Sequence, residues 1–292
     1  MNSRKSLGFV APPDGDQQIM HAQQVIPNRG VHETDSSSTL RIAETFASLQ
    51  GEGILTGTKS FFIRTSGCNL RCWFCDTPYA SWHPEGRPIE IKALVQQAVQ
   101  SGCQHVVLTG GEPMLPAGCV ELVRMLRGEG MHVTIETAGT VYRSLTADLM
   151  SISPKLLGSG PSRPQPPSDR KFNDRQPTNG LPSQESEHLD TSKWSLRHEQ
   201  VRWRPEVIAQ LIKSAVDYQI KFVVDEPADF DKCMAAVSQL AVPAAHVWIM
   251  PQGIDEDSLD RQFQWLSPLV AAAGYRYCDR MHVRWYGNRR GT

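Results

Sequence analysis

Apolar residues along the chain alternate between short continuous runs and longer stretches with helical spacing. Continuous runs predict buried strands, and stretches with a spacing of three and four predict amphipathic helices. The order is KSFFIRTSG, IEIKALVQQAVQSG, HVVLTGGEP, CVELVRMLRGEG, MHVTIETAGT and LMSISPK, then after a gap RPEVIAQLIKSA, YQIKFVVD, ADFDKCMAAVSQLA, HVWIMPQG, DSLDRQFQWLSPLVAAAG and YRYCDRMHVRWYG, read as a last strand. This alternation predicts βαβ units with right-handed crossovers around a parallel sheet.

We count about six strands, which are too few for a closed eight-stranded barrel. The expected fold class is therefore α/β, with an open, partial TIM-type barrel of about six parallel strands. Ligands of such sheets bind at the carboxyl ends of the strands. The unusual turns lie at these ends, namely the cysteine-rich loop at 67–80, TGGEP, ETAGT, SPK and MPQG.

Two segments interrupt the alternation. Residues 1–39 are polar, rich in Gln, Ser and Pro and without periodicity, which predicts a disordered N-terminal tail. Residues from about 157 to 202 are rich in Pro, Ser, Gly and charge, and a loop of this length is unusual inside a compact domain. Because strands and helices resume after it, we interpret it as a disordered insertion in a single domain that spans residues 40–292.

Composition excludes several classes of function. The formal net charge of −1 gives no electrostatic reason to expect nucleic acid or a membrane surface as a partner. Seven cysteines, three of them clustered, are a poor basis for disulfides and are typical of metal chemistry in a reducing compartment. The N-terminal residues lack the apolar core of a signal peptide, and no apolar run approaches the length of a membrane span. We therefore expect a soluble, cytoplasmic protein.

The cysteine cluster lies in the sequence GCNLRCWFCDTPYA, where Cys68, Cys72 and Cys75 follow one another at spacings of four and three. A structural zinc site needs a fourth ligand, for which His83 is the nearest candidate, and three thiols without a metal are another alternative. The third alternative is an iron–sulfur cluster. A cluster held by only three thiolates leaves one iron open to an outside ligand, as in a cofactor-binding centre.

The remaining four cysteines lie in predicted helices or strands. We expect each to be buried as a small hydrophobic residue. They are Cys103, Cys119, Cys233 and Cys278.

The spacing C-x3-C-x2-C with Phe74 before the last cysteine resembles the signature of radical S-adenosylmethionine (SAM) enzymes. The resemblance implies a 4Fe-4S cluster whose open iron binds SAM, cleavage of SAM to a 5′-deoxyadenosyl radical, and a place for Phe74 near the adenine. TGGEP at Thr109–Pro113 follows a predicted strand and is similar to the glycine-rich cofactor loop of that superfamily. Paired glycines allow a ligand to approach the backbone closely.

The order of SLQGEG (48–53), FIRTSGCNLRCWFCDT, TGGEP, ETAGT (136–140) and SPK (153–155) resembles the 7-carboxy-7-deazaguanine synthase family, from about Leu40 to the C-terminus apart from the insertion. The resemblance implies a carbon–nitrogen lyase of queuosine and other 7-deazapurine biosynthesis, a tRNA modification pathway. It would convert 6-carboxy-5,6,7,8-tetrahydropterin to 7-carboxy-7-deazaguanine and release ammonia. It also implies Mg2+, a flavodoxin- or ferredoxin-type reductant and a homodimer, with no direct contact to nucleic acid.

The same resemblance assigns individual residues. The three cysteines would bind the cluster, and Thr77 would bind Mg2+. The residues implied for the substrate are Leu49, Gln50, Gly51, Glu52, Arg64, Thr109 and His282. The residues implied for SAM are Phe74, Gly111, Glu136, Thr137, Ser153, Pro154, Lys155, Met250, Pro251, Gln252 and Gly253. The residue types are suitable, because amides and carboxylates match a pterin edge and the Arg64 fork matches a carboxylate.

Plainer interpretations stay open at this point. The alternative for Arg64 is a surface salt bridge, for Thr77 a hydroxyl that caps a turn, and for Lys155 an ordinary exposed lysine. A lone histidine in a strand, as His282 is expected to be, is usually structural. The ending HVRWYGNRRGT is longer than the family endings, so its contact with a substrate is undecided.

Two other functions compete with the synthase. An activase that makes a glycyl radical on a protein would share the cysteine loop and GGEP but lack SLQGEG and CDT. A zinc- or cluster-stabilised interaction module would need a fourth metal ligand and no paired-glycine turn. Metal analysis separates the module from the enzymes.

Overall fold

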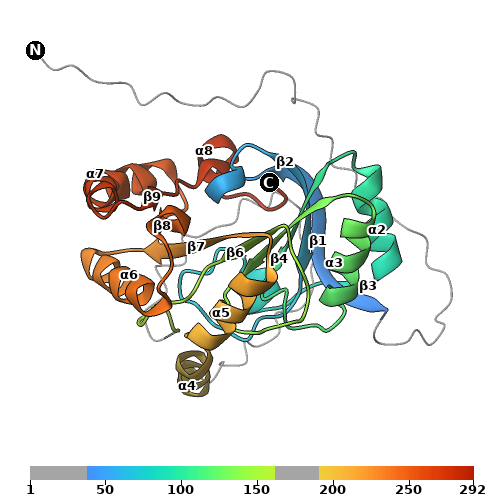
Figure 1. Cartoon of the computed structure of the whole chain (residues 1–292), viewed down its shortest axis with the longest axis horizontal. Helices are drawn as coiled ribbons and strands as arrows, with labels where there is room; N and C mark the ends of the chain where they lie inside the picture. The colour runs from blue at the N-terminus through green and yellow to red at the C-terminus, as the bar shows by residue number, and fades with distance from the viewer. Residues whose placement is uncertain (1–37, 162–190) are drawn as a thin grey trace, which may run out of the picture.

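The sheet of this α/β protein has nine strands in the order β3-β1-β2-β4-β5-β6-β7-β8-β9 (Figure 1). The structure is a computed structural model, and it describes residues 38–161 and 191–292. The strands are β1 (Thr39–Leu49), β2 (Lys59–Thr65), β3 (Arg87–Glu90), β4 (His105–Gly110), β5 (His132–Thr137), β6 (Leu149–Ile152), β7 (Asp217–Val224), β8 (Val247–Pro251) and β9 (Arg276–Tyr277).

The strands β2, β4, β5, β6, β7 and β8 pair in parallel, as the sequence pattern predicts. The two-residue β9 adds to β8 in parallel, whereas β1 is antiparallel to both β2 and β3. The sheet curves but its outermost strands β3 and β9 do not pair with each other, so the barrel is open and partial. The predicted fold class is confirmed.

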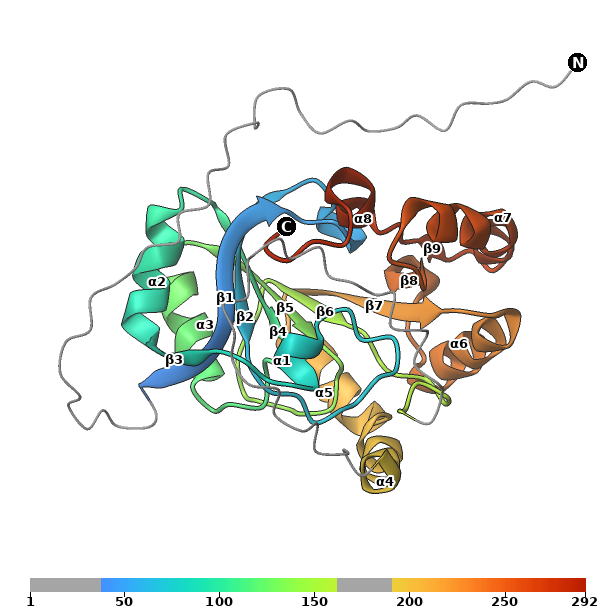
Figure 2. The ribbon, with the colours of Figure 1, turned by 180° about the vertical axis from the view of Figure 1, so that it is seen from behind.

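The helices lie mainly on the outer face of the curved sheet, while the loop that carries α1 lies on the inner face (Figure 2). The helices are α1 (Pro78–Ser81), α2 (Ile91–Gln100), α3 (Cys119–Gly128), α4 (Thr191–Val201), α5 (Pro205–Ser214), α6 (Pro227–Leu240), α7 (Glu256–Ala272) and α8 (Met281–Tyr286), with short 3-10 turns at Gly53–Leu55 (η1) and Ala244–His246 (η2). Strand runs such as Val106–Leu108 pack against the apolar side of these helices to form the core.

The prediction of a long last strand is wrong. Only Arg276 and Tyr277 form β9, and Met281–Tyr286 form helix α8. The apolar residues at 281, 283 and 285 alternate as in a strand, but Val283 alone is buried. Asp279 accepts hydrogen bonds from the Arg280 N–H at 2.7 Å and from Arg284 Nε at 2.7 Å, and these bonds favour a helical turn over an extended chain.

The expected disorder between about 157 and 202 is wrong for its last part, because Thr191–Val201 form α4. Its side chains pack against the cysteine loop through apolar and polar contacts. The local sequence of the helix does not predict these contacts. The middle of the predicted insertion, 162–190, and the predicted tail, 1–37, lie outside the described residues. The first described strand, β1, begins at Thr39.

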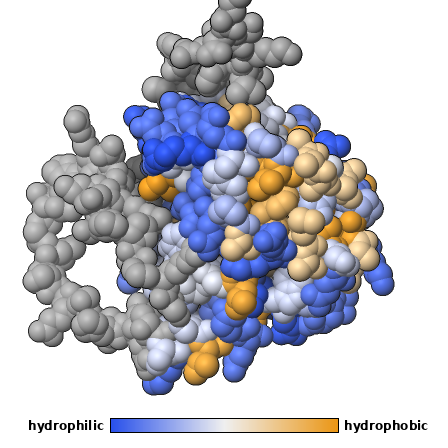
Figure 3. Space-filling view, turned by 90° about the vertical axis from the view of Figure 1, so that its left-hand side faces the viewer, coloured by the Kyte–Doolittle hydropathy of each residue, from blue (hydrophilic) through white to orange (hydrophobic). Residues whose placement is uncertain are grey.

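Apolar side chains also occur on the surface. Helices α6 and α7 carry the exposed Met234 and Leu269, and hydrophobic residues lie among hydrophilic ones on the side of the molecule where these helices lie (Figure 3). Within the described ranges, no helix is both long and apolar enough to cross a membrane.

Candidate active site

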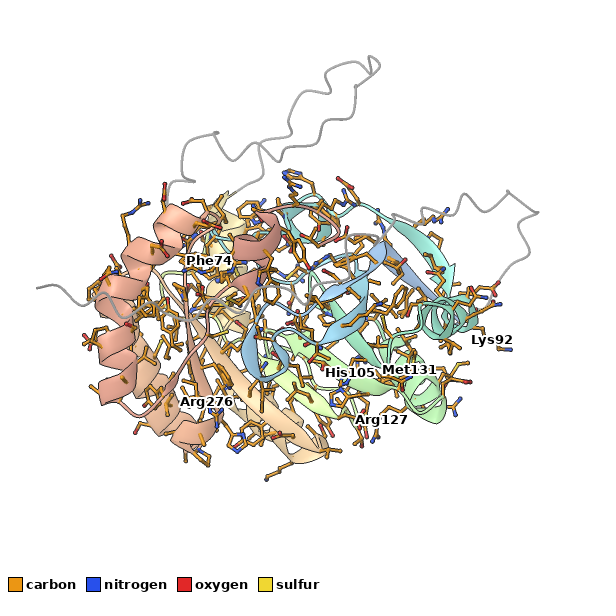
Figure 4. All side chains as sticks on the ribbon, turned by 90° about the horizontal axis from the view of Figure 1, so that it is seen from above. Phe74, Lys92, His105, Arg127, Met131 and Arg276 are labelled. Carbon is orange, nitrogen blue, oxygen red and sulfur yellow. The ribbon has the colours of Figure 1, made fainter. Side chains whose placement is uncertain are left out.

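A cavity opens at the carboxyl ends of the parallel strands, where the sequence predicts the site. Phe74 lies on one side of the molecule seen from above, and His105, at the start of β4, lies with Arg127 and Met131 on the other (Figure 4). All the predicted site residues except Pro154 and Gly253 line this cavity. Pro154 lies beside a small neighbouring pocket with Phe74, and the Gly253 carbonyl accepts a hydrogen bond from Arg280 at 2.6 Å.

The cysteine loop connects β2 to α1 and faces the cavity with all three predicted ligands. Cys68, Cys72 and Cys75 are free of disulfides and line the cavity together. Cys68 Sγ accepts a hydrogen bond from the Leu70 N–H at 3.4 Å, and Cys75 Sγ lies 3.0 Å from Ser81 Oγ. Leu70 and Ala138 form the apolar support behind the thiols. Burial raises the pKa of the Cys68 thiol to about 12 and also raises the pKa of the other two.

This donor set fits a metal cluster better than a single ion. Within residues 38–161 and 191–292, no three Cys, His, Asp or Glu residues lie close enough to hold one metal ion. His83, the candidate fourth zinc ligand, is exposed and does not line the cavity. Three thiols spread around an apolar-backed cavity suit the larger iron–sulfur cluster, and hydrogen bonds to sulfur stabilise thiolate ligands. The other four cysteines are buried, as predicted.

The paired glycines are required by the turn that they form. A Cβ on Gly111 would lie 2.2 Å from the Gly67 carbonyl oxygen, so no larger residue fits between the β4 turn and the cysteine loop. Glu112, the next residue, accepts hydrogen bonds from Thr137 Oγ1 at 2.7 Å and from the Ala138 N–H at 2.8 Å. TGGEP and ETAGT are thus held together by one buried carboxylate, and the Thr137 side chain is occupied by this contact.

A buried ion-pair group lines the same cavity. Lys221 Nζ donates to Glu52 Oε2 at 2.9 Å and to Glu136 Oε1 at 3.2 Å, and the Lys221 side chain is only 4% exposed. Burial alone would raise the pKa of Glu52, but Lys221 and Arg280 lower it well below the usual range. Burial would lower the pKa of Lys221, and the two carboxylates raise it instead. Glu52 and Lys221 are therefore both charged at neutral pH.

Arg280 extends this group toward the cysteine loop. Its guanidinium donates to Glu52 Oε1 at 3.3 Å and pairs with Asp76. Burial would raise the pKa of Asp76, and the Arg280 charge lowers it. The sequence CDT thus carries a fixed anion between Cys75 and Thr77.

His282 lies on α8 instead of a strand, yet it reaches the cavity. Its Nδ1 is 4.0 Å from Glu52 Oε1, and a Cβ on Gly51 would lie 2.3 Å from the same Nδ1. Burial, followed by the Arg280 charge, lowers the pKa of His282. The imidazole is therefore neutral at pH 7, and the SLQGEG turn needs Gly51 to admit it.

Arg64 lines the cavity and also forms an ion pair, with Nε donating to Glu44 Oε1 at 2.7 Å. Glu44 accepts a second hydrogen bond from Tyr79 Oη at 2.7 Å and a third from Arg290 Nε at 3.1 Å. This pair is largely buried, so it is not the surface salt bridge considered from the sequence. It uses the Nε edge of the Arg64 guanidinium.

The C-terminal segment, residues 288–292, lines the cavity. Arg290 holds it in place, with Nη1 donating to Glu85 Oε2 at 2.9 Å and the guanidinium 4.0 Å from the centre of the Tyr79 ring. The C-terminal residues therefore reach the cavity and form part of its wall.

Two further predicted residues, Thr77 and Lys155, also line the cavity. Thr77 is the N-cap residue of α1, but its side chain makes no capping hydrogen bond, and its Oγ1 lies 3.9 Å from Cys75 Sγ. Lys155 Nζ donates to Ser153 Oγ at 2.8 Å and lies 6.0 Å from the centre of the Phe74 ring. Lys155 is thus held at the cavity wall beside the aromatic residue.

The sequence interpretation missed Lys221, Arg280, Asp76 and Tyr79, which all line the cavity. One signal for Lys221 was present, because a lysine inside the apolar strand YQIKFVVD has to be paired when it is buried. Arg280 had no such signal, because its partners lie more than two hundred positions away in the chain.

Residues 62–157 match the family described as the radical SAM superfamily. The chain is 47% identical over 279 residues to a 7-carboxy-7-deazaguanine synthase of Rhodopirellula baltica, covering 94% of this chain and 99% of that protein. It is 37% identical to the enzyme of the same name from Halobacterium salinarum, covering 84% and 89% of the two chains. Among solved structures, QueE from Escherichia coli matches with a TM-score of 0.56 at 19% identity, over 84% of this chain and 95% of that one, which supports the fold.

Proposed function

Because the chain belongs to the 7-carboxy-7-deazaguanine synthase family of the radical SAM superfamily, we propose that it converts 6-carboxy-5,6,7,8-tetrahydropterin to 7-carboxy-7-deazaguanine and ammonia. The observation that carries this proposal is that the three cysteines and the Glu52–Lys221–Arg280 group line one cavity, where Arg280 pairs with Asp76 beside Cys75. A radical centre and a polar substrate-binding group then share one cavity. An interaction module would not need this charged wall.

Cys68, Cys72 and Cys75 hold the 4Fe-4S cluster in this proposal. Together with SAM, the cluster supplies a 5′-deoxyadenosyl radical when both are bound. Since burial raises the pKa of the three thiols, they are protonated without metal, and binding of iron releases protons.

The SAM-binding wall is formed by Phe74, the Ser153–Lys155 turn and the MPQG turn. Phe74 offers a ring face for the adenine, and Lys155, fixed by Ser153, offers a cation for the carboxylate of SAM. Gly111 keeps the β4 turn close to the cysteine loop, so that the backbone can approach the ligand. Glu136, paired with Lys221, lies between this wall and the substrate wall.

The substrate wall binds a pterin through charge and hydrogen bonds. Glu52 is held ionised, so it accepts hydrogen bonds from the N–H donors of the ring. Gln50 is oriented by its Nε2, which donates to Ser60 Oγ at 2.8 Å, and this leaves its carbonyl as a second acceptor. Arg64, with Nε fixed by Glu44, presents its remaining N–H groups to the substrate carboxylate. Leu49, Gly51 and Thr109 complete this wall.

His282 is proposed to take or return a proton during ring contraction. Its neutral imidazole is able to accept a proton at neutral pH, and its place beside Glu52 brings it to the substrate wall. Residues 288–292 exclude water from the same side of the cavity.

We propose Mg2+ at Thr77. The hydroxyl is not used as a helix cap, it faces the cavity, and Mg2+ is commonly bound by few protein groups together with water and substrate oxygens. Thr77→Ser should retain the response of activity to Mg2+, whereas Thr77→Val should abolish it. Equal responses of both variants and the unchanged protein would exclude Thr77 as a ligand.

A flavodoxin- or ferredoxin-type reductant, a homodimeric state and a cytoplasmic location are proposed from the family resemblance. The dimer is tested by light scattering after gel filtration, which should give twice the chain mass of 32.5 kDa. A single chain mass across a range of protein concentrations would contradict it.

The decisive experiment is anaerobic reconstitution with iron and sulfide, followed by reduction and incubation with SAM, Mg2+ and 6-carboxytetrahydropterin. We expect 7-carboxy-7-deazaguanine and ammonia in equal amounts. Formation of 5′-deoxyadenosine without this product would assign a different substrate. Zinc at one equivalent with no sulfide absorbance would reject the enzyme altogether.

Two cysteine variants control that experiment. Cys72→Ala should lose iron and both products, because it removes a ligand. Cys233→Ala should retain them, because this buried thiol lies in the core of α6. Loss of iron in both would mean that the reconstituted iron is not bound at the predicted site.

A further inference from the structure

Helix α4 contacts the backbone of the cysteine loop at the residue before Cys72. The Arg71 N–H donates to Nδ1 of His198 at 3.1 Å, across 127 positions of the chain. His198 is fully buried on α4. Because the Arg71 amide is the donor, Nδ1 has to be the unprotonated nitrogen of the ring.

The other nitrogen of the same ring reaches the residue after Cys72. His198 Nε2 lies 2.9 Å from Ser159 Oγ, and the Ser159 carbonyl accepts a hydrogen bond from the Trp73 N–H at 3.1 Å. With Nδ1 as acceptor, Nε2 carries the proton and donates to the serine. One imidazole thus holds, directly or through Ser159, the peptide groups on both sides of Cys72.

Trp194, one helical turn before His198, holds the Arg71 side chain. The Arg71 guanidinium lies 3.7 Å from the centre of the Trp194 ring, and its Nη1 donates to the carbonyls of Cys68 at 3.0 Å and Leu70 at 2.7 Å. The guanidinium is within electrostatic reach of all three thiols. A fixed positive charge therefore lies beside the predicted cluster.

A second contact of the same helix end supports this arrangement. Val201, the last residue of α4, packs against the apolar group of Leu70, Cys72 and Ala138. Arg202 Nη1 donates to the Lys155 carbonyl at 3.2 Å, which connects the helix end to the proposed SAM-binding turn. Helix α4 is thus attached to the cysteine loop through polar, cation–π and apolar contacts.

We propose that His198 is a positioning residue for the iron–sulfur centre and that Trp194 positions the Arg71 charge beside it. The proposal rests on the proposed function in assuming a cluster at the three cysteines. His198 fixes the loop in the conformation that presents Cys72, so that the thiols need little rearrangement to bind iron. Partners of this kind commonly change metal affinity by about 10-fold to 100-fold when they are removed.

The first test uses the metal-free protein. Hydrogen exchange of the peptide containing residues 68–75 should be faster in His198→Leu, which lacks both ring nitrogens. In His198→Asn the side-chain oxygen takes the place of Nδ1 as an acceptor, so exchange at Arg71 should return toward that of the unchanged protein. Leu196→Ala, at an exposed position of the same helix, is the matched control.

The second test uses the reconstituted protein and a strong iron chelator. We expect iron to be lost about tenfold faster from His198→Leu than from the unchanged protein, with His198→Asn between them. Trp194→Leu should lower the reduction potential of the cluster, because the Arg71 cation that favours the added electron is then held only by the Cys68 and Leu70 carbonyls and moves more freely. A melting temperature for each variant establishes that it is folded.

The outcomes separate this proposal from the proposed function. Unchanged exchange and iron loss in a folded His198→Leu would overturn the positioning role, as would an Asn variant no better than the Leu variant. An unchanged potential in Trp194→Leu would overturn the role given to the Arg71 charge. If the unchanged protein binds no cluster, the proposed function fails, whereas hydrogen exchange still reports whether His198 holds the loop.

Discussion

Lys221 is a buried ammonium group between the carboxylates of Glu52 and Glu136. Its removal deprives both carboxylates of their shared ion-pair partner. In Lys221→Met, Glu52 keeps Arg280 as a partner but Glu136 loses its ion pair with Lys221. Breaking a buried pair commonly costs about 3–5 kcal/mol. We therefore expect a loss of this order in the free energy of unfolding of the metal-free protein, measured in urea.

Lys213→Met is the matched control, because this lysine is exposed on α5 and its loss should change stability by less than about 0.5 kcal/mol. Adding Glu52→Gln to Lys221→Met should recover part of the loss, since fewer unpaired charges are buried. If the two lysine variants unfold at the same urea concentration, the ion-pair group does not contribute to stability.

The buried His198 predicts a pH dependence of stability. Burial lowers the pKa of His198 from 6.5 to about 4, against the opposing effect of Glu199 and with the help of Arg202 and Lys155. The unfolded chain then binds the proton more readily, so stability is fully present above about pH 6.5 and is lost as the pH falls toward 4. Between pH 7 and pH 5 the loss should be about 2 kcal/mol.

The comparison is with His198→Asn, which has no group that titrates in this range. Melting temperatures of the metal-free proteins at pH 7 and pH 5 should fall further for the unchanged protein than for the variant. Parallel curves would show that His198 takes up its proton without loss of stability.

At the scale of elements, the C-terminal segment is a wall of the cavity attached by one side chain. Arg290 pairs with Glu44 and Glu85 and stacks on Tyr79. Arg290→Ala should loosen residues 288–292, weaken substrate binding by about 1 kcal/mol and so raise KM for the pterin about fivefold. The ratio of 5′-deoxyadenosine to product should also rise, because a loosened wall admits water.

Arg261→Ala is the control for this prediction, since Arg261 is exposed on α7 and away from the lining of the cavity. An Arg290 variant with unchanged KM and product ratio would show that the segment holds its place without this side chain.

The elements differ in how far the sequence predicts them. Continuous apolar runs such as HVVL predict buried parallel strands, and β4 and its neighbours agree. Helix α8 was mistaken for a strand because its alternation reflects contacts of single side chains with the cavity and the surface. The sequence does not predict helix α4, because it lies in a polar segment and its stabilising contacts are with the distant cysteine loop.

For the whole molecule, the motif residues could be placed together from the sequence because parallel strands bring their carboxyl ends to one edge. That rule gathers the cysteine loop, TGGEP, ETAGT and SPK without any knowledge of side-chain contacts. It does not predict the ion pairs that Asp76, Lys221 and Arg280 form. These pairs depend on tertiary packing and have no spacing signal in the local sequence.

The pairing of Glu52 with Arg280 has a consequence for biosynthesis. These residues are 228 positions apart, so their contact forms only after residue 280 has been made, whereas the contact of Arg71 with His198, 127 positions apart, can form earlier. The three cysteines are translated before His198 and Arg280. In the proposed function, iron that reached these thiols before Arg280 was made would therefore meet a cavity that lacks the Glu52–Arg280 pair.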